Sequence, residues 1–171
     1  MSKHSTFGPR RETALSKGFT IFLPLLADFV EAERDLEDIK HSDDVALSLW
    51  TRDRDVAKAR LQIALNAMHR LSVRLPEDRP LRNVVILVDR MLDDSETLFP
   101  RQLHREMKAC FFSRFQVAGF GPVAQHRNAM LIQARHLVDA LVALPFYDHV
   151  PTVDLTQVDD LEEHDLLVSA F

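Results

Sequence analysis

The feature that most constrains the fold is a row of apolar residues between Asp53 and Leu75. Its members recur at alternating steps of four and three residues, and they are Ala57, Leu61, Ala64, Met68, Leu71 and Leu75. This spacing places their side chains in one stripe along about six turns of α-helix. Other helices must cover a stripe of this length, so the segment predicts the long central helix of a bundle.

The rest of the chain is consistent with a single helical domain. A length of 171 residues fits one domain with a sizeable core. Hydrophobic residues make up 46% of the chain and charged residues 27%, which is the balance of a globular protein. We therefore expect an all-α bundle of four to five main helices in mostly up-down order, with a short N-terminal helix and a short acidic C-terminal helix.

Charge and turn signals divide the chain into three regions. Residues 1–8 lack periodicity and are expected to form a flexible arm, residues 9–150 the bundle, and residues 151–171 an acidic amphipathic tail that can dock on it. Residues 28–44 are acidic and residues 52–74 are basic, within a chain of net charge −5. We expect these two stretches to complement each other within the fold; the alternative is an exposed patch for a charged partner.

Two signals predict breaks in the first apolar segment. Pro9 suits the first turn of a helix and Gly18 suits the residue just past its end, which predicts a short helix over residues 10–17. Pro24 lacks an N–H and is tolerated best in a first turn. The first long helix is therefore expected to cover about residues 21–40.

The limits of the central helix depend on further local signals. Ser42 is a good helix start, and Thr51 offers a second one, so residues 43–50 either form a separate helix or join the central one. Pro76 cannot continue a regular helix, and we expect the central helix to end around it.

Residues 81–92 are the one segment where the sequence allows a strand. The centre of this segment, Val84-Val85-Ile86-Leu87-Val88, resembles a buried strand in isolation. A strand needs hydrogen-bonded partners, however, and no other segment offers one. We therefore predict a helix that is apolar on most sides and central to the bundle.

Two more helices are predicted in the second half of the chain. The first opens at Pro100, and its apolar face carries Leu103, Met107, Cys110, Phe111 and Phe115. The second covers residues 123–144, with a stripe of Met130, Ala134, Leu137, Leu141 and Leu144. The run 118–122 separates them, because its glycines permit a left-handed exit and Pro122 can start the next helix.

Several observations favour a cytoplasmic protein. The single cysteine, Cys110, cannot form an internal disulfide, which suggests a reducing compartment. The apolar run 19–27 follows basic residues as in a secretory leader, but it contains Pro24, and a cut after Ala27 would leave Leu25 where a small residue is required. No other apolar run approaches the roughly 20 residues of a membrane span.

The sequence shows no motif for catalysis, a metal or a cofactor. Helical metal sites use Glu-x-x-His pairs, and a search three residues before each of the eight histidines finds one acid, Asp38 before His41. The chain also lacks a Gly-x-Ser-x-Gly elbow, a phosphate-binding loop and a dinucleotide fingerprint. We expect no cofactor and lean against an enzyme.

Histidine phosphotransfer requires only an exposed histidine on a helical bundle. The candidates are His69, His104, His126 and His136. Arg70 beside His69, and Arg74 on the next turn, could offset the charge of a phosphate there. The glycine that gives phosphoryl access in such domains is missing, so we favour solvated histidines.

Basic residues also raise nucleic-acid binding as a function. They lie at residues 52–74 and at Arg101, Arg105, Lys108 and Arg114. The chain as a whole is acidic and has no helix-turn-helix signature, so we expect solvated or internally paired faces instead.

Two hypotheses for function follow. The first is a non-enzymatic interaction or regulatory module that binds a protein partner or a second copy. The chain has a basic arm and an acidic amphipathic tail, and no catalytic motif was recognised in it. The alternative is a bundle that encloses a small apolar ligand or a metal. The residues expected to line that interior site are Phe111, Phe112, Phe115, Phe120, His126 and Met130.

Overall fold

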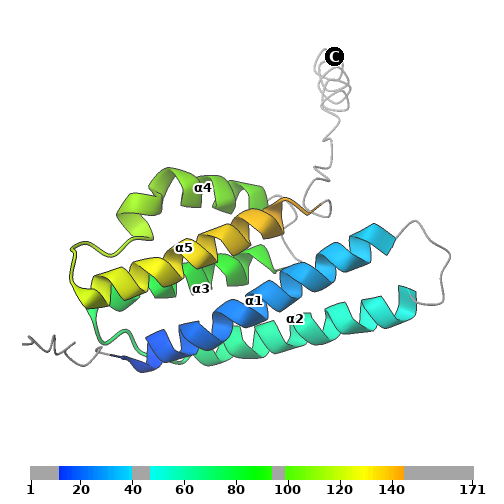
Figure 1. The fold of residues 1–171 in the computed structure, drawn as a ribbon, viewed down its shortest axis with the longest axis horizontal. Coiled ribbons are helices and arrows are strands. Elements are labelled where there is room, and N and C mark those ends of the chain that lie inside the picture. The colour runs from blue at the N-terminus through cyan, green and yellow to red at the C-terminus, as the bar shows by residue number, and fades with distance from the viewer. Residues whose placement is uncertain (1–11, 40–46, 94–98, 145–171) are drawn as a thin grey trace, which may run out of the picture.

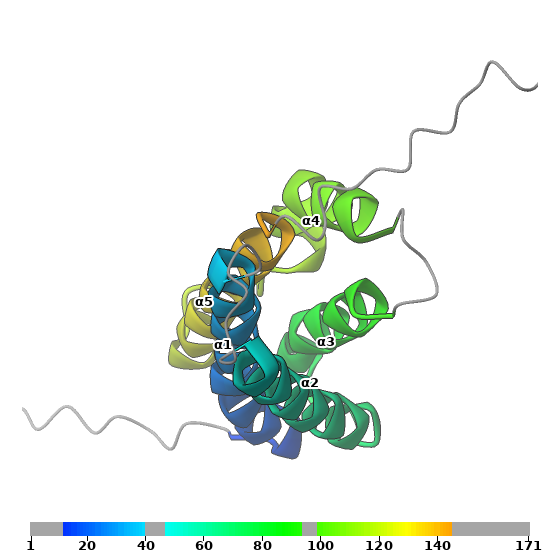
Figure 2. The same cartoon turned by 90° about the vertical axis from the view of Figure 1, so that its right-hand side faces the viewer.

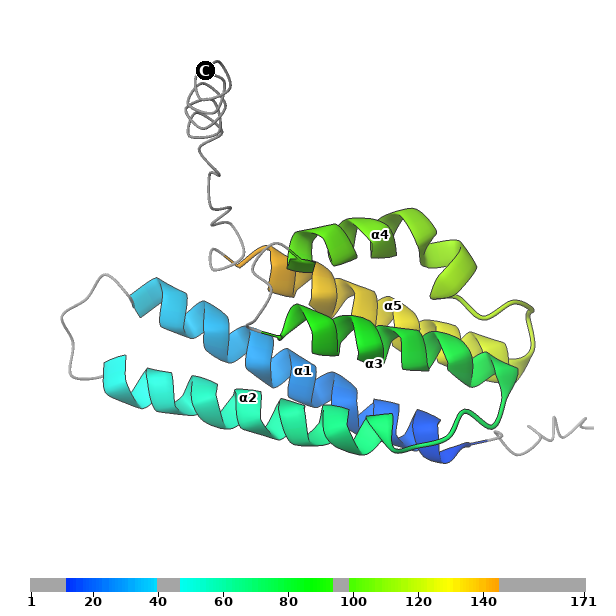
Figure 3. The ribbon, with the colours of Figure 1, turned by 180° about the vertical axis from the view of Figure 1, so that it is seen from behind.

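The computed structural model describes residues 12–39, 47–93 and 99–144, and every regular element in these ranges is helical. The elements are α1 (Ala14–Ile39), α2 (Leu47–His69), the short 3-10 helix η1 (Pro76–Asp78), α3 (Arg79–Met91), α4 (Phe99–Arg114) and α5 (Pro122–Val142). Successive α-helices run in alternating directions (Figures 1 and 3). The predicted all-α bundle is confirmed, whereas the expected arm and acidic tail lie outside the described residues.

Helix α3 contacts each of the other four α-helices. Figure 2 shows it between α2 and α4, with none of the described helices on its outer side. Seven of its 13 residues are buried, namely Pro80, Leu81, Val84, Val85, Leu87, Val88 and Met91. The β-branched run at residues 84–88 is therefore helical, as predicted, and its apolar side chains supply the surface that the other helices cover.

Helix α1 is continuous, so the predicted separate helix over residues 10–17 and the start near residue 21 are wrong. A reciprocal capping pair sets the first turn: the Ser16 N–H donates to Thr13 Oγ1 at 3.1 Å, and the Thr13 N–H donates to Ser16 Oγ at 3.0 Å. These two bonds satisfy backbone N–H groups at the helix start, which explains why α1 begins at Ala14.

Gly18 lies inside α1 because two helices meet there, and not because the chain turns. A Cβ atom at this position would lie 2.5 Å from Met68 Sδ and 3.2 Å from Leu71 Cδ1. The missing side chain thus lets α1 approach the end of α2 closely, and this requirement outweighs the low helix propensity of glycine.

Pro24 also lies inside α1, contrary to the expectation that it marks a first turn. It removes the hydrogen bond that a residue at this position would donate to the Thr20 carbonyl, but both residues are on the exposed side, where water can hydrate that oxygen. The opposite face buries Phe19, Phe22 and Leu26. Packing of this face holds the helix together across the proline.

Helix α2 starts before the predicted central helix and stops well short of Pro76. Residues 47–50 join it, while Leu71 and Leu75 follow its end. The end is fixed from α3: Arg82 Nη1 donates to the Met68 carbonyl at 2.8 Å, and Nη2 donates to the Leu71 carbonyl. These bonds satisfy carbonyl groups that a helix end leaves without partners. The last two residues of the predicted stripe therefore lie beyond the helix that carries the others.

The second half of the chain follows its predicted pattern. Leu103, Met107, Phe111 and Phe115 are buried, and so are Met130, Ala134, Leu141 and Leu144. Helix α4 ends at Arg114, before the predicted exit at residues 118–122, and Gly119, with φ +100°, lies in the loop that follows; Pro122 opens α5 as predicted. One hydrophobic core connects all five α-helices.

Candidate functional site

A surface groove lies where the end of α4, the α4–α5 loop and the start of α5 meet. We call it the α4–α5 groove. None of its eleven lining residues is charged; they are Phe112, Ser113, Gln116, Val117, Ala118, Gly119, Phe120, Gln125, Asn128, Ala129 and Ile132. The groove therefore presents carbon surface and amide groups, with no counter-charge for a phosphate or a carboxylate.

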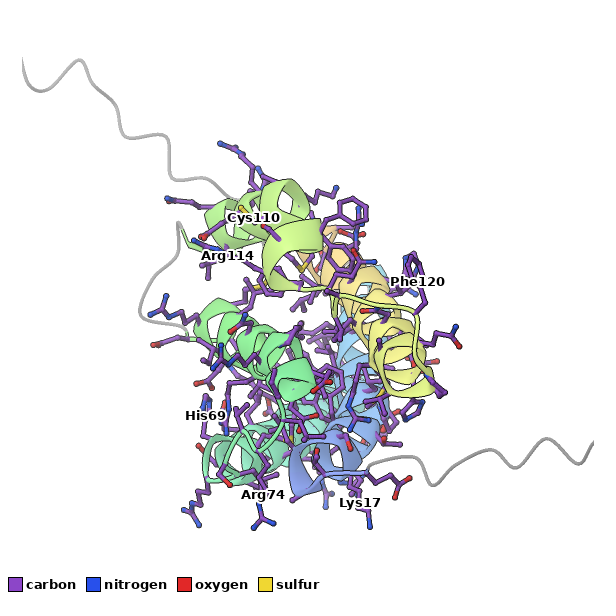
Figure 4. All side chains as sticks on the ribbon, turned by 90° about the vertical axis from the view of Figure 1, so that its left-hand side faces the viewer. Lys17, His69, Arg74, Cys110, Arg114 and Phe120 are labelled. Carbon is purple, nitrogen blue, oxygen red and sulfur yellow. The ribbon has the colours of Figure 1, made fainter. Side chains whose placement is uncertain are left out.

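Three large apolar side chains of this groove are open to solvent. The side chains of Phe112, Phe120 and Ile132 are 77%, 94% and 48% exposed. Figure 4 shows Phe120 at the edge of the bundle, with its ring directed away from the core. Monomeric proteins rarely leave such residues clustered on one face, and patches of this kind commonly mark binding sites.

Side-chain hydrogen bonds hold the loop that carries Phe120. Asn128 Oδ1 accepts the Val117 N–H at 2.8 Å, and Asn128 Nδ2 donates to the Val117 carbonyl at 2.9 Å. Gln125 Nε2 donates to the Phe120 carbonyl at 3.0 Å. The loop is thus anchored to the first turns of α5 on both sides of Gly119. The exposed ring of Phe120 therefore projects from a backbone that these hydrogen bonds hold in place.

The six residues predicted to line an interior site fall into different surroundings. Phe111, Phe115 and Met130 are buried in the common core, and His126 is partly buried. Phe112 and Phe120 lie outside, in the α4–α5 groove. Adjacent residues of a helix point in different directions, so Phe111 and Phe112 could not both face one interior. The structure joins two of the six residues at one surface and places three in the core.

The sequence interpretation missed Gln125, Asn128 and Ile132. Asn128 and Gln125 follow a glycine-containing loop within two turns of a helix start, and this is a recognisable context for side chains that bind loop backbone. Ile132 lies off the core stripe of α5. An isoleucine outside the apolar stripe of an amphipathic helix is the signal that could have placed it in an exposed patch.

Two of the candidate phosphotransfer histidines are already bonded to carboxylates. His104 Nε2 lies 2.6 Å from Asp139 Oδ1, and His69 Nε2 lies 3.0 Å from Asp89 Oδ2. A phosphoryl group on Nε2 of His104 or of His69 would displace the hydrogen bond to the aspartate and would lie beside its negative charge. The Arg74 expected on the turn after His69 lies beyond the end of α2, so that part of the prediction is wrong.

The histidine–aspartate pairs instead join neighbouring helices. His104 on α4 binds Asp139 on α5, and Asp139 also has Lys108 Nζ at 4.0 Å and Arg135 Nε at 3.9 Å. Arg135 in turn lies over the Phe111 ring, with its Cζ atom 4.7 Å from the ring centroid. This polar cluster lies along the α4–α5 contact and lines no part of the α4–α5 groove.

A buried ion pair connects the η1 turn to α5. Arg127 Nε donates to Asp78 Oδ1 at 3.1 Å, and both side chains are almost fully buried. The two residues are far apart in the chain, so no local pattern predicts their contact. A buried pair of this kind is costly to break, because either charge alone would remain in the core.

The acidic and basic stretches meet in the α1–α2 hairpin. Glu33 Oε1 on α1 lies 3.5 Å from Arg54 Nη1 on α2, and Arg54 Nε lies 2.9 Å from Asp55 Oδ1. Asp28 and Arg60 line a common groove nearby. This contact supports the interpretation that the two stretches complement each other within the fold.

Two further observations concern metals and membranes. In the part of the chain that the structure describes, no three His, Cys, Asp or Glu side chains gather closely enough to hold a metal ion. None of the helices in the same ranges has the length and apolar character needed to span a bilayer.

The residues that the structure describes thus form an up-down bundle of five α-helices, with a surface groove that no charged residue lines. A scan against protein-family models found no match, and searches of curated proteins and of solved structures found none either.

Proposed function

We propose that the protein is a non-enzymatic helical interaction module that binds an apolar segment of a protein partner in the α4–α5 groove. The observation that carries this proposal is the pairing of Phe112 and Phe120, both exposed, across a groove without a charged residue. Exposed aromatic rings are the groups that contribute most to protein–protein binding when a partner buries them.

The chemistry of the groove favours a protein segment over a nucleic acid. A phosphate backbone is bound through arginine and lysine, and none lines this groove. An amphipathic helix of a partner places apolar anchors at steps of three and four residues, which two rings and Ile132 can receive. The amide groups of Gln116 and Gln125 provide hydrogen bonds at the rim.

The anchored loop supports the same function. Asn128 and Gln125 fix the backbone on either side of Phe120, so that less freedom is lost when a partner binds. A cytoplasmic location, which the single cysteine suggested, is part of this proposal.

The proposal is tested by photocrosslinking in cells that express the full chain. The photoreactive residue p-benzoylphenylalanine replaces Phe120, and a matched control places it at Gln133, an exposed position of α5 outside the groove. We expect a discrete adduct with another protein from position 120 and not from position 133. The adduct should disappear when Phe112→Ser and Ile132→Ser are added, because the partner then loses the remaining anchors. Equal labelling at both positions, or an adduct with a second copy only, would contradict the proposal.

A further inference from the structure

Helix α2 carries a second apolar row, on the side that faces away from the core. Leu49, Val56 and Ile63 are 61%, 42% and 70% exposed, and they follow one another at intervals of seven residues. Seven residues make almost two helical turns, so the three side chains form one row, about 20 Å long. We call it the α2 outer row. The buried residues of this helix, Leu61, Leu65 and Met68, lie on another face.

The α2 outer row borders a shallow groove between α1 and α2. Leu25 and Asp28 line this groove from α1, while Asp53, Val56 and Arg60 line it from α2. Val56 belongs to both features, so the groove lies beside the middle of the row. An exposed heptad row beside a groove is the arrangement that helices use to pair, since side chains of one helix enter the spaces of the other.

Two of the exposed charges near Val56, Asp53 and Arg60, are placed in a self-complementary way, whereas a third, Arg52, lies at the level of Arg60 of the second copy in the same register. Asp53 lies three residues before Val56 and Arg60 lies four residues after it, and both are exposed. If two copies of α2 pair antiparallel about a two-fold axis at Val56, Leu49 of one copy faces Ile63 of the other. Asp53 then lies beside Arg60 of the second copy, and the symmetry repeats the contact. A two-fold interface requires a surface that matches itself in this manner.

We propose that the α2 outer row is a homodimer interface, in which α2 pairs antiparallel with α2 of a second copy. A parallel pairing would instead bring Arg60 toward Asp55 of the other copy, and that carboxylate already lies 2.9 Å from Arg54 within the chain. In the antiparallel pairing, all three aliphatic residues are covered and both flanking charges gain a partner. The second copy is therefore the occupant that the row fits.

This interface is separate from the α4–α5 groove. Helices α2 and α4 lie on opposite sides of α3 (Figures 1 and 2). A dimer built on α2 leaves the groove of each copy open, and would present two grooves to a partner. Partner binding and dimerisation can thus fail independently, since they depend on different residues.

The main experiment is sedimentation velocity of the full chain over a range of concentrations. We expect the sedimentation coefficient to rise with concentration from monomer to dimer. Val56→Asp places two carboxylates together at the two-fold axis and should raise the dissociation constant about tenfold or more. Gln133→Asp, at an exposed position of α5 that lines neither groove, is the control and should leave the dissociation constant unchanged. A monomer at every concentration, or a dimer that Val56→Asp leaves intact, would overturn the proposal.

Charge exchange tests the register of the pairing. Asp53→Arg and Arg60→Asp should each weaken the dimer, because each change places like charges together across the interface. The double exchange should restore it, since opposite charges then face each other again. If the weakening of the dimer in the double variant equals the sum of the two single effects, Asp53 and Arg60 do not meet, and the proposed register is wrong.

Disulfide trapping tests the direction, in a Cys110→Ala background. Val56→Cys should give a crosslinked dimer on mild oxidation, because this position lies on the two-fold axis. Leu49→Cys alone should not crosslink, whereas Leu49→Cys combined with Ile63→Cys should. Efficient crosslinking of Leu49→Cys alone would show a parallel pair and overturn the antiparallel arrangement.

Discussion

The α1–α2 hairpin and the α4–α5 hairpin both pack against α3, but they are held together differently. The first is joined by close contact of long helices, with Gly18 against Met68 and an ion pair between Glu33 and Arg54. The second is joined by directed polar contacts, with His104 bound to Asp139 and Asn128 bound to the Val117 backbone. Close packing restricts the size of the residues in contact, whereas hydrogen bonds restrict their identity. The two hairpins should therefore respond to different substitutions.

The largest expected effect is at the link between the hairpins. Arg127→Met leaves the Asp78 carboxylate buried without its charged partner, and should lower the free energy of unfolding by about 3–5 kcal/mol. Urea denaturation measures this loss. Arg90→Met, an exposed arginine of α3, is the control and should change little. Adding Asp78→Leu to Arg127→Met should recover part of the stability, because no charge then remains in the core. A double variant less stable than Arg127→Met would contradict the assignment of the loss to a buried charge.

Gly18→Val tests the close packing of the first hairpin. The added side chain would meet the buried Met68 and should destabilise the protein by about 1–3 kcal/mol. Ala59→Val on the exposed side of α2 is the matched control, since it introduces the same β-branched residue into a helix without a buried neighbour. Thermal unfolding compares the two variants. Valine has a higher helix propensity than glycine and a lower one than alanine, so a Gly18→Val protein as stable as the parent would mean that α1 and α2 have room at Gly18.

Asn128→Ala tests the polar contacts of the second hairpin. It removes both hydrogen bonds to the Val117 backbone and should cost about 1–2 kcal/mol. It should also raise hydrogen exchange at the Val117 amide, which then lacks its acceptor. Gln125→Ala removes one exposed bond and should cost less. Unchanged exchange at Val117 in Asn128→Ala would show that other contacts fix the loop.

The smallest effect on stability is expected at the exposed apolar residues. Phe112→Ser with Phe120→Ser, or Leu49→Ser with Ile63→Ser, should change the free energy of unfolding by less than about 0.5 kcal/mol, because these side chains are largely exposed. Urea denaturation at low protein concentration, where a dimer is dissociated, is the measurement. A loss above about 2 kcal/mol in either variant would place those residues in the core of the fold rather than at its binding faces.

Much of the second half of the chain could be predicted from local signals. The stripes that include Met107 and Met130 were recognised, and the glycine and proline signals at Gly119 and Pro122 marked the right break. In the first half, the same kinds of signal gave wrong predictions, namely a helix end at Gly18 and a helix start near Pro24. A glycine or proline disfavours a helix only locally, and the burial of a whole apolar face can outweigh that cost.

The residues predicted to line one interior site do not share one environment. The cluster of phenylalanines could not show that Phe111 faces the core while Phe112 faces the groove. That distinction depends on which side of α4 the other helices cover. The α2 outer row presents the same difficulty. Leu49, Val56 and Ile63 are apolar like the core residues, and they differ only in that they remain exposed.

The sequence by itself determined that this chain folds into helices and which side chains repeat along their faces, because helical periodicity is a property of neighbouring residues. The tertiary structure decided where α1 and α2 begin and end, that Asp78 meets Arg127, and which apolar residues remain uncovered. Each of these outcomes depends on groups that another helix brings to the same place, such as Met68 at Gly18 or Arg82 at the end of α2. Contacts between distant segments supply that information, and local sequence does not.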